Sequence, residues 1–481
     1  MNKYFITNAI PYVNAKPHIG HALEFIQSDV ITRYHRIIGD DTLLLCGGDE
    51  NALKNVQAAE KVKRHVKEFV DENAKLFEDL AKNLNVHFDV FQKGSATKHH
   101  LSSQKLWELC DKNNDIYKKE YTGLYCVGCE LFYEKEELDQ NGECPEHPGK
   151  KLEEVTEENY FFKLSKYEKE ITKLIQTNQL LITPSQRKNE ALSFLKQGLK
   201  DISISRSNKR AKNWGVPVPN DETQRMYVWF DALNIYQSGI GFGWDEEKYK
   251  KWWPADVHVI GKGILRFHAI YWIAFLLSAK LDLPKSILVH EYITVNGQKM
   301  SKTIGNVIDP NELIQKYGTE ALRYYLLRTI SPFSDGDFSE EKFRENYNSD
   351  LANGLGNLIA RVAKLCENAN YTQLISQEKS SVHLINIEDY SQALSEYRFN
   401  DALGVIWKKI TLLDKYINDE KPWELQKKND ARLKSVLNHS VDQIQEIAAL
   451  LEPFIPETAK KIEDQFKGPT IKSQPPLFPR L

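Results

Sequence analysis

The sequence predicts an α/β protein that is built on a parallel sheet, interrupted by an insertion and followed by an all-α region. Strand and helix patterns alternate over residues 1–115, and parallel-sheet patterns return over residues 223–294. Between them, residues 116–222 are rich in aromatic and charged side chains and contain cysteines and short strand patterns. Residues 351–481 are almost wholly helical in pattern. These three observations together predict a split α/β domain followed by a helical domain.

The first unit that the sequence predicts is a strand, a helix and a second strand. Residues 3–9 and residues 42–46 are short apolar runs typical of buried strands. Residues 22–38 predict a helix that ends at Gly39. One face of that helix carries the apolar residues Leu23, Ile26, Val30, Tyr34 and Ile37. In a doubly wound sheet, ligands bind beyond the carboxyl ends of such strands.

The later segments predict how the chain continues. Strand patterns at residues 226–229, 257–260 and 287–295 indicate that the parallel sheet resumes, so the insertion splits a Rossmann-like domain. Residues 295–350 form a transition with a lysine-bearing loop and a helix around residues 310–328. The apolar spacing beyond this transition, over residues 351–481, predicts an antiparallel helix bundle.

Length and composition limit the class of protein. A chain of 481 residues exceeds one ordinary core, so two to four domains are expected. The net charge of -3 gives no global attraction for nucleic acid, so an RNA partner would meet local basic patches. No apolar stretch reaches membrane-spanning length, and the amino terminus carries no signal or transit pattern. With only six cysteines, we expect a cytoplasmic protein.

The run His18-Ile19-Gly20-His21 lies where a nucleotide-binding turn belongs, after a strand and at the start of a helix. A helix N-terminus favours phosphate, and Gly20 removes a side chain where a flat base could approach the backbone. His18 and His21 could donate hydrogen bonds to the oxygens of a phosphate under attack. Alone, the four residues could equally be a pair of ordinary, partly buried histidines.

A second motif, Lys299-Met300-Ser301-Lys302-Thr303, follows far downstream and lies between glycines. A glycine-flanked loop can move, and ammonium groups on it could tighten on a triphosphate as charge develops. Most such lysine pairs belong to solvated basic turns. The presence of both motifs in this order favours the catalytic interpretation.

A third pattern predicts a metal site inside the insertion. Cys126 and Cys129 are followed, after fourteen residues, by Cys144 and His147. Two paired-ligand turns at this spacing give a filled tetrahedral shell for Zn²⁺, so the metal would be structural. The alternative is a set of incidental thiols in a reducing compartment. The remaining cysteines are expected in the core, and they are Cys46, Cys110 and Cys366.

With these motifs the chain resembles the class I aminoacyl-tRNA synthetases, and specifically the methionyl-tRNA synthetases, over nearly its whole length. The resemblance is carried by residues 8–22 (NAIPYVNAKPHIGHA), 125–130 (YCVGCE), 158–165 (ENYFFKLS), 205–219 (SRSNKRAKNWGVPVP), 227–233 (YVWFDAL), 267–272 (FHAIYW), 295–303 (VNGQKMSKT) and 421–423 (KPW). It implies a methionine-tRNA ligase that forms methionyl-adenylate from methionine and ATP and transfers the methionyl group to tRNA(Met). It also implies one structural Zn²⁺ in the connective insertion and Mg²⁺ with ATP.

The resemblance assigns roles to individual residues. His18, His21, Lys299 and Lys302 are the implied catalytic residues, which stabilise charge on the reacting phosphates. ATP binding adds Gly20, Met300, Ser301 and Thr303. The methionine site maps onto Ala9, Ile10, Tyr12, Asp49, Arg206, Trp229, Ala232, Leu233, Tyr236, Ile264 and His268. The anticodon site maps onto Asn357, Arg361 and Trp423. Because some relatives append a dimer-forming domain for which this chain has no room, the resemblance implies a monomer.

Two positions depart from the family pattern. Asn51 stands where the family often has histidine, after Asp49 and Glu50. Gly263 stands where the family has aspartate, which removes a carboxylate near the expected ribose and substrate site. We expect these departures to affect affinity rather than the identity of the reaction.

Two other functions remain open on the sequence. A synthetase for cysteine or for a branched aliphatic amino acid would share both motifs, but the first would place zinc in the active site and the second would carry a longer insertion. A non-catalytic RNA-binding protein descended from a synthetase is the alternative from another class, and the departures at Asn51 and Gly263 keep it open.

Overall fold

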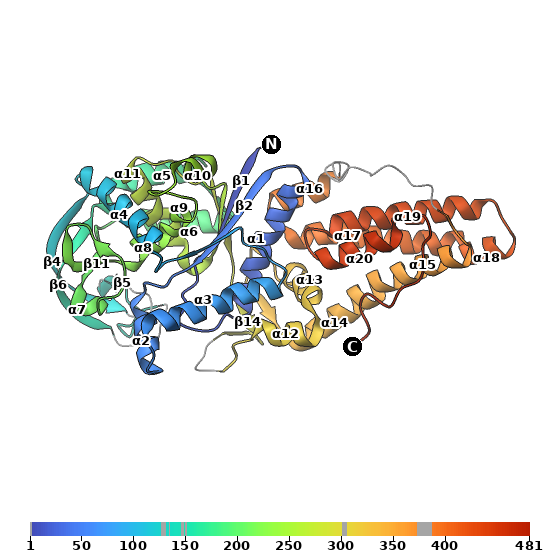
Figure 1. Cartoon of the computed structure of the whole chain (residues 1–481), viewed down its shortest axis with the longest axis horizontal. Helices are drawn as coiled ribbons and strands as arrows, with labels where there is room; N and C mark the ends of the chain where they lie inside the picture. Colours follow the sequence, from blue (N-terminus) through green and yellow to red (C-terminus); the bar gives the residue numbers. More distant parts are fainter. Residues whose placement is uncertain are drawn as a thin grey trace.

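The computed structural model describes residues 2–126, 131–133, 135–145, 149, 152–300, 305–372 and 387–481. The molecule is elongated, with an α/β part at one end and a helix bundle at the other (Figure 1). The C-terminal segment runs back along the bundle, and the Leu481 backbone N–H donates to Asn348 Oδ1 at 3.0 Å. Within the described residues, no helix combines the length and the apolar character needed to cross a membrane.

The α/β part is built on a six-stranded parallel sheet with the strand order β3-β2-β1-β12-β13-β7. The strands are β1 (Lys3–Asn8), β2 (Asp41–Gly48), β3 (Val90–Lys93), β7 (Leu181–Thr183), β12 (Val257–Gly261) and β13 (Ser286–His290). The central strands are buried on both faces, as expected of a sheet covered by helices. The order turns between β1 and β12, so the carboxyl ends of these two strands mark the ligand-binding edge.

Helices cover both faces of this sheet. α1 (Ile19–Ile37) follows β1 and begins three residues before the predicted start, because the two histidines of the first motif cap it. It ends at Ile37, and the chain turns away at Gly39, whose positive φ of 93° suits glycine. The other helices of this part include α2 (Leu53–Lys61), α3 (Val66–Asn83), α4 (Thr97–Lys112), α10 (Glu246–Trp252) and α11 (Ile273–Ala279). The Rossmann-like prediction is therefore confirmed.

The segment over residues 116–222 contains its own sheets. A long hairpin of β4 (Ile116–Cys126) and β6 (Glu153–Phe162) is flanked by β5 (Leu131–Tyr133) and β8 (Ile202–Ser203). A smaller sheet contains β9 (Ser205–Ser207), β10 (Pro217–Val218) and β11 (Asp221–Met226). The helices α5 (Glu168–Gln176), α6 (Ser185–Leu195) and the short α7 (Asn208–Ala211) complete it.

The structure differs from the prediction at several elements. β7 lies within residues 116–222 yet pairs in parallel with β13 at the edge of the main sheet. Residues 226–229 are not a strand, because β11 ends at Met226 and α8 (Val228–Leu233) begins directly after Tyr227. The aromatic and β-branched side chains there favour a strand locally, but packing in the core selects a helix. α9 (Ile235–Ser238) continues the helical path.

The predicted strand over residues 287–295 is also divided. The chain leaves the main sheet after His290 and forms a second sheet of β14 (Ile293–Val295), β15 (Gln298–Lys299) and β16 (Gly336–Phe338). Asn296 and Gly297, with φ angles of 50° and 75°, make the two-residue turn between β14 and β15. The helix predicted around residues 310–328 is two helices, α12 (Pro310–Tyr317) and α13 (Thr319–Thr329), separated at Gly318 with a φ of 86°.

The C-terminal part is all-α, as predicted. α14 (Glu340–Asn346) continues through the π-helical segment η5 (Tyr347–Gly356) into α15 (Asn357–Asn368), which leads away from the sheet (Figure 1). The remaining helices are α16 (Glu388–Ser395), α17 (Phe399–Glu420), α18 (Pro422–Lys427), α19 (Arg432–Leu451) and α20 (Pro456–Phe466). Their buried apolar faces form one cluster that continues into the side of the sheet covered by α1 and α13.

Arg323 joins the two parts at the centre of that cluster. Its side chain is fully buried on α13 and its guanidinium contacts the Asp29 carboxylate of α1 at 2.7 Å. It also donates to the backbone oxygens of Phe454 at 2.7 Å and of Pro453 at 3.1 Å, in the turn before α20, and of Leu84 at 3.1 Å after α3. One buried cation therefore ties the first sheet helix to the bundle.

Candidate active site

The first motif forms the N-terminus of α1. His18 is the N-cap, and its Nδ1 accepts from the Gly20 backbone N–H at 3.1 Å, while His21 Nδ1 accepts from the His18 backbone N–H at 3.1 Å. The two rings are tilted by 31° relative to each other, with their centroids 3.9 Å apart. Because both Nδ1 atoms are acceptors, both rings are neutral with the proton on Nε2, the form that can donate to a phosphate oxygen. Burial, with the nearby His18 and His290, lowers the pKa of His21 well below its ordinary value.

The second motif lies beside this helix start. A methyl group placed on Gly20 would lie 3.9 Å from Met300 Cε, and the Ile19 backbone N–H donates to the Ile308 oxygen at 3.1 Å. Segments on both sides of the lysine-bearing loop therefore contact the first turn of α1. Lys299 is exposed on β15. The rest of the motif, Ser301, Lys302 and Thr303, lies outside the described residues.

The predicted methionine site gathers at the same edge of the sheet, on the opposite face from α1. Most of the predicted residues lie in the apolar cluster on that face of the sheet or pack against it. They are Ala9, Ile10, Tyr12, Trp229, Ala232, Leu233, Tyr236 and Ile264. The Trp229 ring stacks on Phe267 at 3.7 Å and meets the edge of Tyr12 at 6.1 Å. Such a set of rings suits a polarisable thioether side chain. Sequence reasoning did not assign Phe267, although it begins the quoted string FHAIYW.

A hydrogen-bonded chain fixes the proton positions in this pocket. His268 Nδ1 lies 2.9 Å from the Ile264 carbonyl oxygen, and His268 Nε2 lies 2.7 Å from Tyr236 Oη. Since a carbonyl only accepts, Nδ1 carries the proton, and Nε2 accepts from the Tyr236 hydroxyl. Burial lowers the pKa of His268 to about 4 and raises that of Tyr236 well above its ordinary value. Both groups are therefore neutral at physiological pH.

The two predicted polar members lie on different elements. Asp49 directly follows β2, is buried, and forms a parallel bridge with Tyr12. Arg206 lies on β9 and is buried between aromatic rings, with Cζ 4.7 Å from the centroid of Tyr125 and 5.0 Å from that of Tyr227. Arg206 therefore connects the hairpin of β4 and β6 to the residue that precedes α8.

The departure at Asn51 has a structural role. The Asn51 amide nitrogen donates to Asp231 Oδ2 at 2.5 Å and to the Gly94 oxygen at 2.9 Å. Asp231 is buried on α8, between Trp229 and Ala232. The amide therefore ties the loop after β2 to the helix that carries much of the predicted methionine pocket.

Sequence reasoning also missed a buried ion pair near the histidines. His290, at the end of β13, places Nε2 2.9 Å from Glu24 Oε2 on α1 and Nδ1 2.9 Å from the Glu291 carbonyl oxygen. A carbonyl and a carboxylate both accept, so this arrangement favours a ring that carries protons on both nitrogens. Although burial disfavours the charged ring, the Glu24 carboxylate raises the pKa of His290. The pairing could not be predicted because the two residues are far apart in the sequence.

The predicted metal ligands are only partly described. Cys126 at the end of β4 and Cys144 are buried in one small cluster with Tyr133. Cys129 and His147 lie outside the described residues. Over the parts of the chain that the structure covers, no group of three or more potential ligands is found. Two buried thiols brought together from distant positions fit the donor set of a zinc knuckle.

The predicted anticodon residues lie on the bundle. Asn357 and Arg361 are one turn apart on α15, and Trp423 lies in the first turn of α18. Arg361 donates to Asp414 Oδ1 at 2.9 Å and Asn418 Oδ1 at 2.6 Å, and its Cζ lies 5.1 Å from the Trp423 ring centroid. Arg361 and Trp423 therefore form one cation–π unit.

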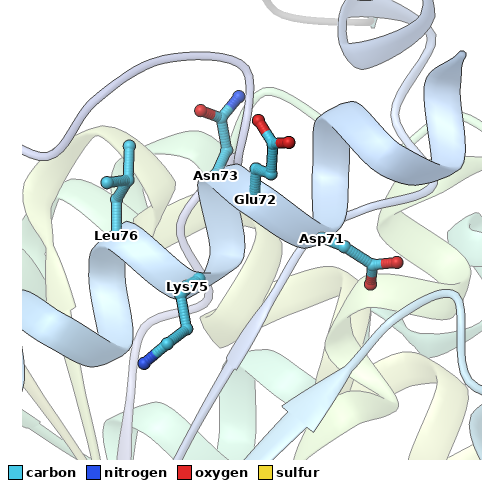
Figure 2. Close-up of a pocket in the computed structure, with 5 residues that line it drawn as sticks. All are labelled: Asp71, Glu72, Asn73, Lys75 and Leu76. Carbon is cyan, nitrogen blue, oxygen red and sulfur yellow. The ribbon is translucent and has the colours of Figure 1, made fainter.

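A separate hollow lies on the surface of α3. It has a volume of about 520 Å³ and is lined by Asp71, Glu72, Asn73, Lys75 and Leu76 (Figure 2). The Asn73 amide reaches the Val13 oxygen at 2.8 Å, in the loop before the first motif. None of the predicted site residues lines this hollow, so it is not the predicted active site.

The fold and the arrangement at the switch point define a class I aminoacyl-tRNA synthetase. The family described as "tRNA synthetases class I (M)" matches residues 4–363, and the chain belongs to it. Within that class the chain is a member of the methionine-tRNA ligases. It is 42% identical to the methionine-tRNA ligase of Thermotoga maritima, covering 96% of this chain and 74% of the relative. It is 39% identical to that of Brucella melitensis, covering 98% and 93%.

Solved structures agree with this assignment. Mycobacterium tuberculosis methionyl-tRNA synthetase in complex with methionyl-adenylate has a TM-score of 0.92 and 34% identity, and the match covers 100% of both chains. The apo form of the same protein has a TM-score of 0.84 and 32% identity, with 100% and 98% of the chains covered. The present fold therefore lies nearer to the adenylate-bound form than to the apo form.

Proposed function

We propose that this protein is a methionine-tRNA ligase that works in two steps. In the first, a methionine carboxylate oxygen attacks the α-phosphorus of ATP, the bond to the bridging oxygen breaks, and pyrophosphate leaves. In the second, a ribose hydroxyl of the terminal tRNA adenosine attacks the adenylate carbonyl and AMP leaves. The observation that carries this proposal is the meeting of both motifs at the first turn of α1, beside an aromatic pocket at the same sheet edge.

The first step needs charge stabilisation rather than a covalent nucleophile. The neutral rings of His18 and His21 present Nε2–H donors at a helix N-terminus, where the dipole also favours phosphate. Lys299 and Lys302 would tighten on the triphosphate as charge develops in the transition state. Mg²⁺ would accompany ATP and offset part of its charge. Catalysis is then mostly positioning and electrostatics.

The pocket explains the choice of amino acid. A thioether side chain would pack against Trp229 and Tyr12, since polarisable sulfur makes favourable contacts with rings. The Tyr236 hydroxyl donates to His268, so its lone pairs are left to meet the substrate. We assign Asp49 to the substrate ammonium and Arg206 to its orientation, because their charges suit these roles.

The metal and the RNA contacts belong to the same proposal. Cys126, Cys129, Cys144 and His147 would hold one Zn²⁺, which supplies a structural crosslink to the insertion. On the bundle, Trp423 would stack on an unpaired anticodon base, while Asn357 and Arg361 would bind base edges. We further propose a cytoplasmic monomer, for which light scattering should report a mass near 55.7 kDa. A mass of twice that value at micromolar concentration would contradict the monomer.

The test is amino-acid-dependent exchange of pyrophosphate into ATP, run with each of the twenty amino acids. Methionine alone should support fast exchange, which would exclude a synthetase for cysteine or an aliphatic amino acid. His21→Ala and Lys302→Ala should each lower the rate by about 100-fold or more, because each removes a donor used mainly in the transition state. Absence of exchange with every amino acid would instead favour the non-catalytic RNA-binding protein.

A further inference from the structure

The departure at Gly263 creates a space that another side chain occupies. Gly263 lies just after β12, in the turn of 3₁₀-helix over Lys262–Ile264. A methyl group added at this position would lie 2.2 Å from Tyr292 Oη and 3.4 Å from Tyr292 Cζ. No side chain fits at position 263 while the Tyr292 hydroxyl stays in place. Glycine here and tyrosine at 292 are therefore a matched pair.

Two lysine ammonium groups lie close to the Tyr292 ring. Lys262 Nζ is 4.6 Å from the ring centroid and Lys299 Nζ is 5.4 Å from it. The hairpin explains the second contact, because Thr294 pairs with Lys299 across β14 and β15. Side chains two residues apart along a strand share a face, so Tyr292 is a diagonal neighbour of Lys299. The aromatic face thus meets the first lysine of the second motif.

Polar contacts fix the position of Tyr292. Its backbone N–H donates to Asp335 Oδ1 at 3.0 Å. Lys262 Nζ, which lies over the ring, contacts Asp335 Oδ1 at 2.6 Å and the buried Glu291 Oε2 at 2.9 Å. Glu291 also receives Arg187 Nε at 2.6 Å. The Tyr292 backbone is therefore held at the start of the second sheet, and Lys262, just after β12, links its ring to the end of the main sheet.

We propose that Tyr292 is a positioning residue for Lys299. Its hydroxyl sits over Gly263, its ring faces the Lys299 ammonium, and the lysine-bearing hairpin is thereby held in register with the nucleotide site. Glycine in place of the family's aspartate at position 263 would then leave room for Tyr292 and keep the Lys299 ammonium in its position. This inference rests on the proposed function, in which Lys299 stabilises the triphosphate during adenylate formation.

The first experiment tests the matched pair. Gly263→Ala should lower kcat for methionine-dependent pyrophosphate exchange by about 3- to 30-fold, since the methyl group displaces the ring from Lys299. Adding Tyr292→Phe removes the clashing hydroxyl and leaves the remaining contact at ordinary packing distance. The double variant should return to within about twofold of Tyr292→Phe alone. A double variant as slow as Gly263→Ala would overturn the steric match.

The second experiment tests the action through Lys299. Tyr292→Leu should lower kcat for exchange by about 3- to 30-fold with an unchanged KM for methionine, whereas Tyr292→Phe keeps the ring and should lose little. In a Lys299→Met background, Tyr292→Leu should have almost no further effect. A full effect of Tyr292→Leu in that background would overturn the inference, as would an equal rise in the KM for methionine.

The variants distinguish an error in the role of Lys299 from an error in the role of Tyr292. If Lys299→Met exchanges pyrophosphate at the wild-type rate, the role of Lys299 in the proposed function is wrong. If Lys299→Met is slow and Tyr292→Leu is as fast as the wild type, only the role of Tyr292 is wrong. Thermal unfolding of each variant identifies any loss of activity that follows from misfolding.

Discussion

The protonation of His268 determines how the Tyr236 hydroxyl is oriented in the predicted methionine pocket. His268 donates from Nδ1 to the Ile264 oxygen and accepts from Tyr236 at Nε2, so a proton added to Nε2 would remove the acceptor. The Tyr236 hydroxyl would then have to turn toward the substrate. The protonation state of one buried ring therefore controls the polarity of the pocket.

Acid should weaken the fold partly through His268. The folded pKa of about 4 lies below the ordinary value of 6.5, so between these values the unfolded chain binds a proton that the folded chain does not. Stability from this group is present above pH 6.5 and falls as the pH drops toward 4, by at most about 1.4 kcal/mol per pH unit. His268→Gln should give a shallower loss in urea unfolding between these pH values. An unchanged slope would contradict the assignment.

Trp229 should matter for methionine and not for ATP. Trp229→Leu removes the stack on Phe267 and the edge contact with Tyr12, so the KM for methionine in pyrophosphate exchange should rise by about 10-fold or more. The KM for ATP should change by about twofold at most. Trp252→Leu is the matched control, because this tryptophan belongs to the same cluster but not to the predicted pocket. Equal rises in both KM values would contradict the pocket assignment.

Residues that belong to a recognisable motif could be predicted from the sequence. Residues that act through tertiary contacts could not. His18 and His21 were placed at a helix start from the local pattern alone, and the structure confirms that position. Tyr292 carried no local signal, because its partners Gly263 and Lys299 become neighbours only when the main sheet and the hairpin meet. Contacts of this kind depend on tertiary packing, which periodicity does not encode.

At the scale of elements, the insertion combines a long hairpin with a cysteine cluster. Cys126 ends β4 and Cys144 lies in the chain between β5 and β6, so a shared metal would close the distal end of this hairpin. Short strands that bury little apolar surface would gain much of their folding stability from such a crosslink. Arg206 contacts Tyr125, the neighbour of Cys126, so the cysteine cluster adjoins a predicted substrate residue.

Elemental analysis should find one zinc per chain. Cys126→Ser should lose the metal and increase proteolysis within the insertion, since a missing ligand opens the shell. The control is Cys110→Ser, which changes a buried thiol on α4 outside the cluster and should keep the zinc. A fully active native protein without metal would contradict the zinc assignment.

The elements that the sequence predicted well have long periodic patterns. α1 and the bundle helices repeat their apolar positions over many residues, so the helical period is unambiguous. β7 is only three residues long and was missed. Residues 226–229 were predicted as a strand from their aromatic and β-branched content, yet α8 starts at Val228 because the core on that side of the sheet is filled by its rings.

At the scale of the whole molecule, a continuous helical run and Arg323 join two distant regions. The continuous helical run from Glu340 to Asn368 leads from the sheet part to the far end of the bundle (Figure 1). Arg323 fastens the near end of that bundle to α1. The predicted anticodon residues and the predicted catalytic histidines thus belong to one connected structure.

Trp423→Ala should separate the two reactions. Methionine activation should stay near wild type, because Trp423 lies on the bundle, far from α1 (Figure 1). The efficiency of tRNA charging should fall about 5- to 150-fold, equivalent to a stacking contribution of about 1 to 3 kcal/mol. Trp407→Leu is the control, since the Trp407 ring on α17 packs against Tyr324 of α13 at 4.5 Å between centroids and should affect stability rather than charging. An equal loss in exchange and charging would mark Trp423 as a core residue.

Arg323→Met should destabilise the whole chain. The substitution leaves Asp29 with one fewer cation and removes the donor to three buried carbonyl oxygens. Loss of one partner from a buried ion pair of this kind costs about 3–5 kcal/mol. Urea unfolding monitored by tryptophan fluorescence should therefore shift to lower denaturant, or split into two transitions if the sheet part and the bundle uncouple. Unfolding indistinguishable from wild type would show that Arg323 does not join the two parts.

The buried Arg323 also has a consequence for how the protein would measure its RNA. Opening the junction between the sheet part and the bundle would be costly, because it would separate the buried guanidinium from the Phe454 and Pro453 oxygens. The distance between the bundle tip and the first turn of α1 would then stay nearly constant. A bound tRNA would have to hold its anticodon and its acceptor end at that same distance. An RNA with the correct anticodon but an altered elbow would have to deform itself to reach both, so its overall shape is selected together with its bases.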